Sequence, residues 1–303
     1  MSFSLEAKAE LVRSEPRKKC CALAECYGIL LYCNTFTARE IRIITASAEL
    51  AEALPRLFRR AFGISFDQLP PPDAEGKRSF AITARGKVEE IFRAFGMEAT
   101  DTLALHINLG VLESDCCRAS FVRGAFLAGG SITDPEKGYH LELATSHMSV
   151  SREMYSVLLE LGFSPRSATR GRSFVTYFKQ SEAIADFLTR IGASVAALEL
   201  MAAKVEKDMR NEINRKVNCD TANADKTVAA AQQQLAAIRR IESEHGLDSL
   251  PEGLQQAALL RIANPEASLA DLAQLSYPPV TKSCLSHRLK KLTELGRGIA
   301  KED

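Results

Sequence analysis

The stretch FVRGAFLAGGSITDP, residues 121–135, decides the fold, because an earlier stretch, AECYGILLYCNTF at residues 24–36, repeats its pattern. Each stretch is predicted to be an apolar helix with a glycine in its middle. An offset of 96 residues (124 − 28) places Gly28 on Gly124. The same offset aligns two pairs of adjacent cysteines, Cys20-Cys21 and Cys116-Cys117. The sequence therefore predicts an internal duplication.

A glycine inside a helix costs about 1 kcal/mol relative to alanine. Two glycines at equivalent places therefore indicate that two helices approach closely there. The two stretches resemble the LAGLIDADG helices of homing endonucleases. That resemblance implies that the helices pack along a pseudo-twofold axis, and that an acidic residue at the lower end of each helix helps to hold catalytic magnesium.

The acid positions of the two helices fall on Cys33 and Gly129, and neither residue offers the hard oxygen ligand that Mg²⁺ requires. Asp134 and Glu136 follow the second helix, but they sit in a predicted Asp-Pro turn. Ligands from one side alone leave a magnesium site incomplete. We therefore predict a scaffold without catalytic residues, not an enzyme, and keep a residual nuclease using Asp134 and Glu136 as an unfavoured alternative.

The composition is that of a globular protein of two or three domains, with 303 residues, a net charge of +1 and 46% hydrophobic residues. No apolar run approaches the ~20 residues that span a bilayer, and residues 1–20 lack the apolar core of a signal peptide. These features predict a cytoplasmic protein that does not contact membranes. Adjacent cysteines lack the CxxC spacing of zinc sites, so we predict buried, inert thiols, no metal and no cofactor.

Apolar periodicity and turn residues predict similar elements in both halves. In the first half, they are a strand over residues 37–47, a helix over 48–61, strands over 64–69 and 77–85 around a turn at 70–72, and a helix over 87–95. In the second half, they are a helix over 115–128, a strand over 139–146, a helix over 151–161, a hairpin over 163–179 and a helix over 181–191.

The hairpin is basic, because residues 163–179 contain four cationic side chains and no acidic one: Arg166, Arg170, Arg172 and Lys179. In the homing endonucleases, two antiparallel sheets form a saddle on DNA. The resemblance therefore implies a secondary DNA contact at these residues. An ordinary solvated loop tip explains them equally well, since basic loops are common on protein surfaces.

The C-terminal third is predicted to be helical. It begins with a helix over residues 195–216 whose apolar face holds Leu198, Met201, Ala202, Val205, Met209 and Ile213. A linker over 214–227, rich in Asn, Asp and Thr, comes before a helix over 228–244. Helices over 254–263 and 268–275, a Ser-Tyr-Pro-Pro turn at 276–279 and a helix over 281–295 follow.

The last of these helices has an inner stripe of leucines, Leu285, Leu289, Leu292 and Leu295, and a basic, hydroxylated outer face. This pattern predicts a helix-turn-helix, with a small structural bundle as the alternative. Recognition helices insert their N-terminal residues into the major groove, so the residues expected to meet bases are Thr281, Lys282, Ser283, Ser286 and His287. Those expected to meet phosphates or the domain's own acidic residues are Arg288, Lys290 and Lys291.

Taken in order, these pieces are similar to the WhiA family, Gram-positive bacterial DNA-binding proteins that join a degenerate LAGLIDADG domain to a C-terminal helix-turn-helix. The blocks that carry the similarity are the Cys-Cys and Ala-Glu pairs at 20–25, FVRGAFLAGGSITDP, NRKVNCDTANADKT at 214–227, GLDSLPEGLQ at 246–255 and NPEASLADLAQLSYPPVTKSCLSHRLKKL at 264–292. The first LAGLIDADG helix departs from the family pattern at Cys26 and Leu31, where leucine and a polar or basic residue are expected.

The resemblance implies an α+β fold. A duplicated LAGLIDADG-like domain over residues 1–192 (halves about 18–95 and 115–192) is followed by a connecting helix and linker over 193–227, and by an all-α helix-turn-helix domain over 228–303. It also implies a cytoplasmic, nucleoid-associated protein that binds double-stranded DNA in cell division and chromosome segregation, and regulates transcription of sporulation genes in sporulating relatives. A scaffold that acts through a protein partner, such as another transcriptional regulator, is the alternative.

Overall fold

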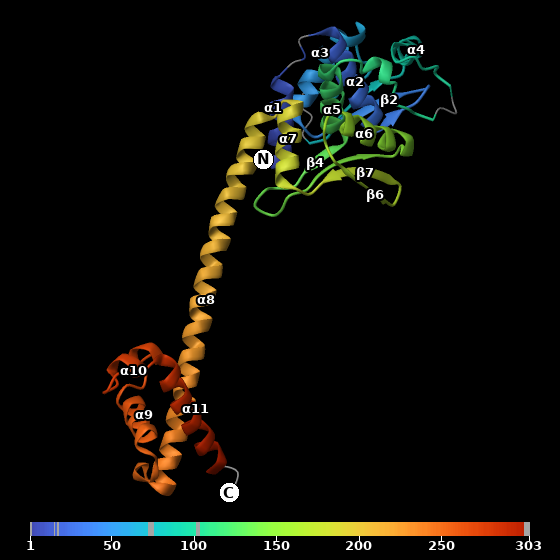
Figure 1. Ribbon diagram of the computed structural model, residues 1–303. Coiled ribbons are helices and arrows are strands. Elements are labelled where there is room, and N and C mark those ends of the chain that lie inside the picture. The colour runs from blue at the N-terminus through green and yellow to red at the C-terminus, as the bar shows by residue number, and fades with distance from the viewer. Residues whose placement is uncertain (1, 15, 17, 72–75, 101–103, 300–303) are drawn as a thin grey trace. The chain divides into compact units, whose positions relative to one another are not determined.

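The computed structural model describes residues 2–14, 16, 18–71, 76–100 and 104–299 (Figure 1). It comprises two compact units, Met1–Asp208 and Met209–Asp303. The predicted turn at Pro72, part of the segment between the halves and the last four residues lie outside the described ranges. In the part of the chain that is described, no helix is both long enough and apolar enough to cross a membrane.

The N-terminal unit presents one order of elements twice, after a first helix, α1 (Phe3–Arg13). The first half contains α2 (Lys19–Tyr32), β1 (Thr35–Phe36), β2 (Ile41–Thr45), α3 (Ala48–Phe62), β3 (Arg78–Ile82) and α4 (Arg85–Ala94). After a 3₁₀ turn, η1 (Leu109–Val111), the second half contains α5 (Asp115–Gly129), β4 (Gly130–Ile132), β5 (Leu141–Thr145), α6 (Met148–Glu160), β6 (Arg166–Arg170), β7 (Ser173–Phe178) and α7 (Ser181–Ile191).

Each half builds an antiparallel sheet whose strand order follows the duplication. The first sheet has the order β1-β2-β3, and the second has the order β4-β5-β7-β6. The strand predicted over residues 64–69 is wrong, since this segment contributes only an isolated bridge between Gln68 and Ala81. Its continuation is blocked by Pro70 and Pro71, which have no N–H to donate to a ladder.

The two glycine-containing helices, α2 and α5, form the spine of this unit (Figure 1). A Cβ added to Gly28 would lie 2.0 Å from the carbonyl oxygen of Phe121, and a Cβ added to Gly124 would lie 2.0 Å from the carbonyl oxygen of Glu25. Neither position admits any side chain while the backbones remain at this distance. The close helix approach predicted from the glycines is therefore confirmed.

The first spine helix ends earlier than the apolar pattern suggests. Instead of continuing to Phe36, α2 ends at Tyr32, and Cys33 already has an extended backbone. Phe36 pairs with Ile41 in the sheet. The predicted end is wrong because Phe36 is apolar and buried in the strand as it would be in a helix, so it does not mark the boundary.

The first helix, α1, lies outside the elements that sequence patterns predict, and it fixes the start of a much longer one. The carboxylate of Glu10 accepts hydrogen bonds from the backbone N–H groups of Val195 (2.8 Å) and Ala196 (2.9 Å). These are first-turn donors of α8 (Ser194–His245) and have no partner within the helix. A carboxylate at this end is also favoured by the helix dipole.

The linker predicted over residues 214–227 is wrong, because this segment lies inside α8, which is continuous over 52 residues. Asn, Asp and Thr cost only a few tenths of a kcal/mol each in a helix, far less than Pro, so they weaken a helix without ending it. The apolar face predicted for the helix over residues 195–216 is also largely exposed: Leu198, Val205 and Met209 are 57–71% exposed.

The C-terminal unit contains the end of α8, a 3₁₀ turn η2 (Leu247–Ser249), α9 (Glu252–Ala263), α10 (Leu269–Leu275) and α11 (Lys282–Ile299). Its core consists of Ile238, Ile241, Leu254, Ala257, Ala258, Leu272, Ala273, Leu285, Leu289 and Leu292. Three of the four leucines predicted on the inner face of α11 are therefore confirmed. Leu295 is the exception, at 42% exposed, because α11 extends past the short helices that cover its first turns.

Candidate nucleic-acid interface

The helix α11 presents a basic face to solvent because its opposite face is anchored in the core. Leu285, Leu289 and Leu292 are almost completely buried against α8, α9 and α10. Their spacing of 4 and 3 residues places the other side chains on the outer face. Among the α11 residues expected to meet DNA, those that are exposed are Lys282, Ser283, Ser286, His287, Lys290 and Lys291.

Two of the residues predicted to contact DNA also have structural roles in this unit. The hydroxyl of Thr281 accepts a hydrogen bond from the backbone N–H of Cys284 (3.2 Å), so it caps the start of α11. The guanidinium of Arg288 packs on α9, since a Cβ added to Gly253 would lie 3.3 Å from its Cζ atom. Arg288 is half-buried as a result, and the exposed lysines carry most of the positive charge of this face.

The short helix α10 has a well-defined start, which fixes its position before the turn. Ser268 and Asp271 form a capping box, in which the Ser268 hydroxyl accepts from the Asp271 N–H and the Asp271 carboxylate accepts from the Ser268 N–H. In the turn that follows, the hydroxyl of Ser276 donates to the carbonyl of Pro278 (2.9 Å). Tyr277 is 92% exposed there. An aromatic residue in this Pro-rich turn is a signal that sequence reasoning did not use.

A buried arginine holds the connection between α9 and α10. Arg261 is 2% exposed, and its Nη1 donates to the carbonyl oxygen of Ala267 at 2.7 Å, with those of Asn264 and Pro265 at 3.4 and 3.5 Å. Burial lowers the pKa of this guanidinium. Arg261 positions the loop that leads into the helix-turn-helix, and its apolar surroundings in sequence gave no sign of this role.

The predicted secondary contact lies on the open face of the second sheet. Because side chains alternate between faces along a strand, the register of β6 with β7 places Arg166 and Arg170 on the same face as Tyr177. The ammonium of Lys179 lies 5.6 Å from the Tyr177 ring centroid. Arg172 lies in the turn between the two strands. The structure therefore brings Arg166, Arg170 and Lys179 to one surface.

An acidic side chain reduces the positive charge of this surface. Glu142 of β5 accepts from Arg170 (2.8 Å) and lies 2.9 Å from Nε2 of His140. Burial acts to raise the pKa of Glu142, but the contacts with His140 and Arg170 outweigh it, and the pKa lies below its ordinary value. Glu142 is therefore ionised at neutral pH and partly neutralises Arg170. The net positive charge of this sheet face is therefore smaller than its arginines alone suggest.

The acid positions of the LAGLIDADG helices hold no metal ligand suited to magnesium. The Cys33 thiol donates to the carbonyl oxygens of Leu30 (3.1 Å) and Thr35 (3.2 Å), and burial raises its pKa to about 12. At Gly129, an added Cβ would lie 2.6 Å from the carbonyl oxygen of Ala144. The Asp134 carboxylate accepts from the Glu136 N–H at 3.0 Å, as the turn interpretation predicts.

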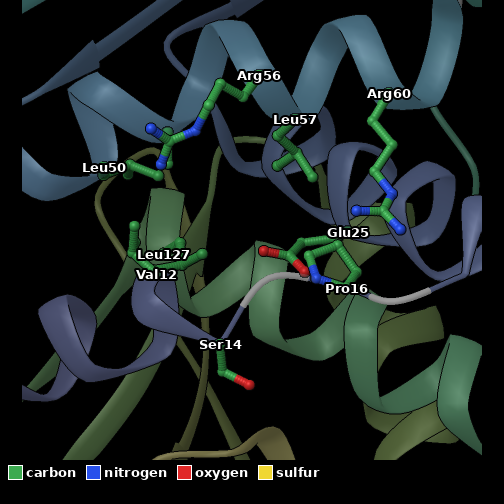
Figure 2. Close-up of a pocket in the computed structure, with 10 residues that line it drawn as sticks. Val12, Ser14, Pro16, Glu25, Leu50, Arg56, Leu57, Arg60 and Leu127 are labelled. Carbon is green, nitrogen blue, oxygen red and sulfur yellow. The ribbon is translucent and has the colours of Figure 1, made fainter.

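One carboxylate lies buried in the spine, beside a pocket of the N-terminal unit (Figure 2). Glu25 is 4% exposed and faces apolar side chains of α1, α3 and α5, including Val12, Leu57 and Leu127. Burial raises its pKa to about 7, although the positive charge of Arg123 opposes the shift. Their closest atoms are 3.6 Å apart, too far for a hydrogen bond.

Comparisons with known proteins agree with this architecture. The model of the WhiA LAGLIDADG-like domain matches residues 118–210, and that of the WhiA C-terminal HTH domain matches residues 213–296. A relative from Ruminiclostridium cellulolyticum, named "Probable cell division protein WhiA", is 39% identical, with 100% of this chain and 99% of the relative covered. One of the same name from Heliobacterium modesticaldum is 35% identical, covering 100% of this chain and 98% of the relative.

A solved structure shows the same fold. The crystal structure of full-length WhiA from Thermatoga maritima matches with a TM-score of 0.59 and 24% identity, and the match covers 98% of each chain. The fold is accordingly α+β, with a LAGLIDADG-like domain followed by a helix-turn-helix domain. With close relatives matched over their whole length, the chain belongs to the WhiA family.

Proposed function

We propose that this protein binds double-stranded DNA through its helix-turn-helix and acts without catalysis, in the cytoplasm and on the nucleoid, in cell division and chromosome segregation. In this proposal it regulates transcription, including that of sporulation genes in sporulating relatives. The observation that carries the proposal is the outer face of α11, where Lys282, Lys290 and Lys291 are exposed while the leucines of the opposite face are buried. The name of its relatives, cell division protein, supports the cellular role.

In this proposal, the residues that read bases and the residues that contact phosphates lie in different parts of α11. Lys282, Ser283, Ser286 and His287 lie in the first two turns, where recognition helices meet base edges. Lys290 and Lys291 lie further along, and the Lys290 ammonium is 3.9 Å from Glu294, with both side chains exposed. Exposed pairs of this kind contribute little, so phosphate can replace the carboxylate as the partner of Lys290.

The DNA-binding part is tested by salt titration of affinity. The full chain is compared with a variant carrying Lys282→Ala, Lys290→Ala and Lys291→Ala, using labelled duplex DNA and fluorescence anisotropy. Each phosphate contact contributes about 0.9 to the slope of log affinity against log salt. We expect weaker binding and a slope smaller by about 2, because Lys290 and Lys291 are the two of these residues expected to meet phosphates.

The matched control removes two exposed lysines of α8, Lys216→Ala and Lys226→Ala, and should leave affinity and slope almost unchanged. An unchanged slope in the α11 variant would remove the basis of the proposal. It would then favour the alternative in which the protein acts as a scaffold for protein partners.

Genome-wide occupancy separates the two candidate DNA surfaces. Occupancy of the full chain is compared with that of a chain truncated after Lys216. Discrete sites that vanish on truncation assign sequence reading to the C-terminal unit. Sites that persist assign it to the LAGLIDADG-like domain, with Arg166, Arg170, Arg172 and Lys179 as the principal contact.

The same proposal includes the absence of catalysis. It is supported by Cys33 and Gly129, which occupy the acid positions of the two LAGLIDADG helices and offer no oxygen ligand for magnesium. The unfavoured alternative is a residual nuclease that uses Asp134 and Glu136. Incubation of the full chain with duplex DNA and Mg²⁺ or Mn²⁺ should yield no cleavage. Metal-dependent cleavage that disappears with Asp134→Ala and Glu136→Ala would establish the nuclease instead.

A further inference from the structure

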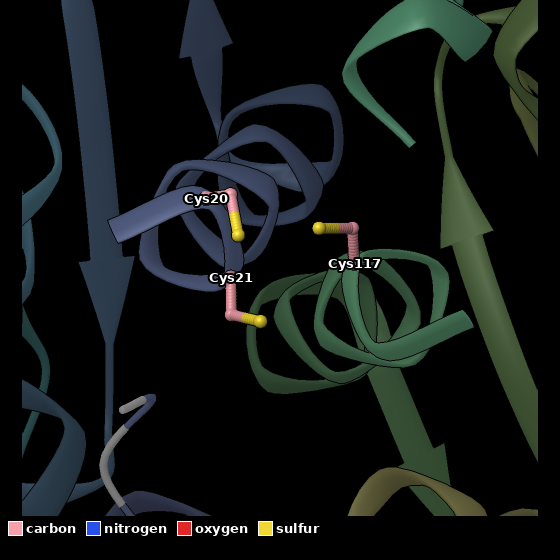
Figure 3. A group of neighbouring side chains, drawn as sticks. All are labelled: Cys20, Cys21 and Cys117. Carbon is pink, nitrogen blue, oxygen red and sulfur yellow. The ribbon is translucent and has the colours of Figure 1, made fainter. Parts of the chain in front are cut away.

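Four cysteines gather where the two spine helices begin. Cys20 and Cys21 lie in the first turn of α2, and Cys116 and Cys117 lie at the equivalent positions of α5. Figure 3 shows the sulfur atoms of Cys20, Cys21 and Cys117 in the space between the ends of the two helices. The duplication therefore brings together two pairs that are 96 residues apart in the sequence (116 − 20).

Three of the four sulfur atoms form a tight group, and the fourth lies next to it. Those of Cys20, Cys21 and Cys117 lie within 4.8 Å of one another. The sulfur of Cys116 lies outside this set of three, but it contacts the Ser114 hydroxyl at 3.2 Å, and the same hydroxyl donates to the Cys117 sulfur at 3.1 Å. A tetrahedral site with Zn–S distances of about 2.3 Å has sulfur–sulfur edges of about 3.8 Å. The sulfur atoms of Cys20, Cys21 and Cys117 need to approach one another by about 1 Å at most, and that of Cys116 needs to join them.

The surroundings of the thiols act in two directions: burial raises the pKa of Cys21 to about 12 and also raises that of Cys117, whereas two helix starts and two lysines beside them favour negative charge. Neither N-cap residue, Lys18 of α2 nor Ser114 of α5, makes a side-chain cap, so both described helix ends direct first-turn N–H groups at this region.

The first turn of α2 holds no acidic residue, whereas that of α5 holds Asp115, which is paired with Arg118 and Arg190. Lys18 and Lys19 are cations at a helix start, an unfavourable place unless an anion lies nearby. Thiolates would supply that anion.

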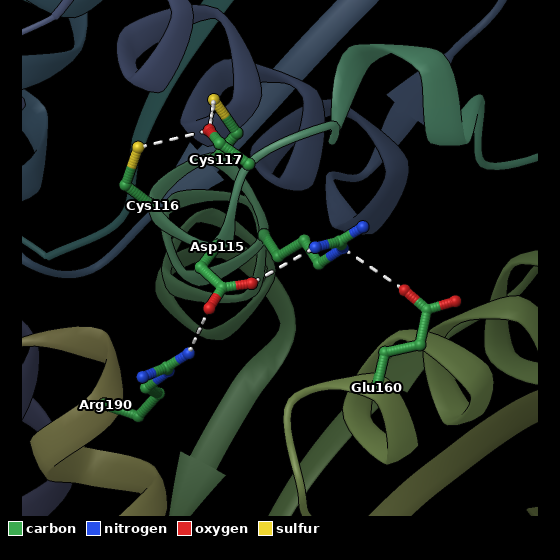
Figure 4. Close-up of polar contacts among 7 residues, drawn as sticks. Asp115, Cys116, Cys117, Glu160 and Arg190 are labelled. Carbon is green, nitrogen blue, oxygen red and sulfur yellow. Dashed lines mark hydrogen bonds and ion pairs between the residues drawn. The ribbon is translucent and has the colours of Figure 1, made fainter.

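The site is held in place and open to solvent on one side. Asp115 pairs with Arg118 (3.2 Å) and Arg190 (3.3 Å), and Arg118 also pairs with Glu160 (3.2 Å), which fixes the start of α5 (Figure 4). Cys21 and Cys117 are buried, whereas Cys20 and Cys116 are exposed. A surface hollow that includes Lys18, Cys21, Cys116 and Arg190 leads to the group.

We propose that Cys20, Cys21, Cys116 and Cys117 form a tetrathiolate site for Zn²⁺ that ties the starts of α2 and α5 together. Binding releases the thiol protons to solvent and changes no oxidation state. The sequence argued against a metal because the two cysteines of each pair are adjacent and lack the CxxC spacing of zinc sites. Only the fold brings the two pairs together. A closed S₄ site suits a structural role, since no coordination position remains for substrate.

The test uses the full chain, reduced and stripped of metal by a chelator. After Zn²⁺ is added and the excess is removed by gel filtration, the zinc content is expected to be one ion per chain. Addition of Co²⁺ should produce the sulfur-to-cobalt charge-transfer and visible bands of a tetrahedral thiolate site, and Zn²⁺ should displace them. Cys20→Ser and Cys116→Ser replace exposed thiols and should preserve the fold. Each should nevertheless weaken Zn²⁺ binding by more than about 100-fold. Loss of a residue that only supports a metal ligand costs up to about that much, and loss of a ligand itself should cost more.

The control variant, Cys219→Ser with Cys284→Ser, removes the cysteines of the C-terminal unit and should bind Zn²⁺ as the natural chain does. Failure of the folded, reduced chain to bind zinc and to give the cobalt bands would overturn the proposal. So would zinc binding that the control variant loses. Disulfide formation between the two pairs, seen by mass under mild oxidation in a chain that binds no metal, would assign the cluster to thiol oxidation.

Discussion

At the scale of single residues, the spine depends on two missing side chains. A methyl group at Gly28 would overlap the Phe121 carbonyl oxygen at 2.0 Å, so the helices must separate to admit it. Overpacking commonly costs 1–3 kcal/mol when side chains can adjust, and here the obstacle is backbone. Gly28→Ala is therefore expected to lower the free energy of unfolding of the N-terminal unit by at least about 3 kcal/mol, measured by urea denaturation.

The control is Gly86→Ala, another glycine inside a helix, where an added Cβ meets nothing within 4 Å. It should leave the stability unchanged or raise it by up to about 1 kcal/mol, because alanine is the better helix former. Equal effects of the two substitutions would contradict the close packing of α2 on α5.

The buried carboxyl of Glu25 makes the stability of this unit depend on pH. Its pKa rises from 4.5 in the unfolded chain to about 7 in the folded one, because burial penalises the charged form. The folded state therefore binds the proton more tightly. This contribution is fully present below about pH 4.5 and is lost as the pH rises to about 7, a change on the order of 3 kcal/mol.

Denaturation of the natural chain and of Glu25→Gln across this range measures the effect. Glutamine does not titrate, so the difference between the two free energies of unfolding should move in favour of the variant as the pH rises. A constant offset is expected from the changed environment of Arg123 and carries no information. A difference that stays constant from pH 4 to pH 8 would show that Glu25 keeps its ordinary pKa.

At the scale of elements, α11 is held by a close contact as well as by its leucines. A Cβ added to Gly296 would lie 2.7 Å from the carbonyl oxygen of Ala237 in α8, within the C-terminal unit. Gly296→Ala should therefore destabilise this unit by about 1–3 kcal/mol in thermal unfolding. Gly298→Ala, in the same helix but with nothing within 4 Å, should be neutral or slightly stabilising.

Elements whose boundaries are marked by nearby residues in the sequence could be predicted. Features that depend on contacts between distant segments could not. The helix over residues 181–191 was predicted with the bounds of α7, because serine precedes an apolar period and Gly192 follows it. The end of α2 was missed because Phe36 is apolar in both helix and strand. In the candidate site, the exposed lysines of α11 followed from periodicity, whereas Arg261 and the meeting of the four cysteines depend on chain segments that only folding brings together.

At the scale of the whole molecule, α8 runs through both compact units, and its middle makes no tertiary contacts that bury it. Every residue from Asp208 to Ala230 is exposed. Most helical stability in proteins comes from packing, and residues 214–227 are poor helix formers. We expect amide hydrogen exchange to be fastest there among the described helices, and slowest in α2 and α5. Exchange mass spectrometry checks this, and equal protection of 214–227 and α2 would contradict it.

Gly129 lies at a position where the surrounding backbone and side chains leave no room for the carboxylate that a nuclease would need. A designer who introduces Gly129→Asp places the new Cβ 2.6 Å from the Ala144 carbonyl and 2.8 Å from the Tyr32 ring. The strand β5 and the end of α2 then need redesign before the carboxylate can reach a metal. The partner position, Cys33, needs its own replacement. A magnesium site at these two positions thus requires several coordinated substitutions.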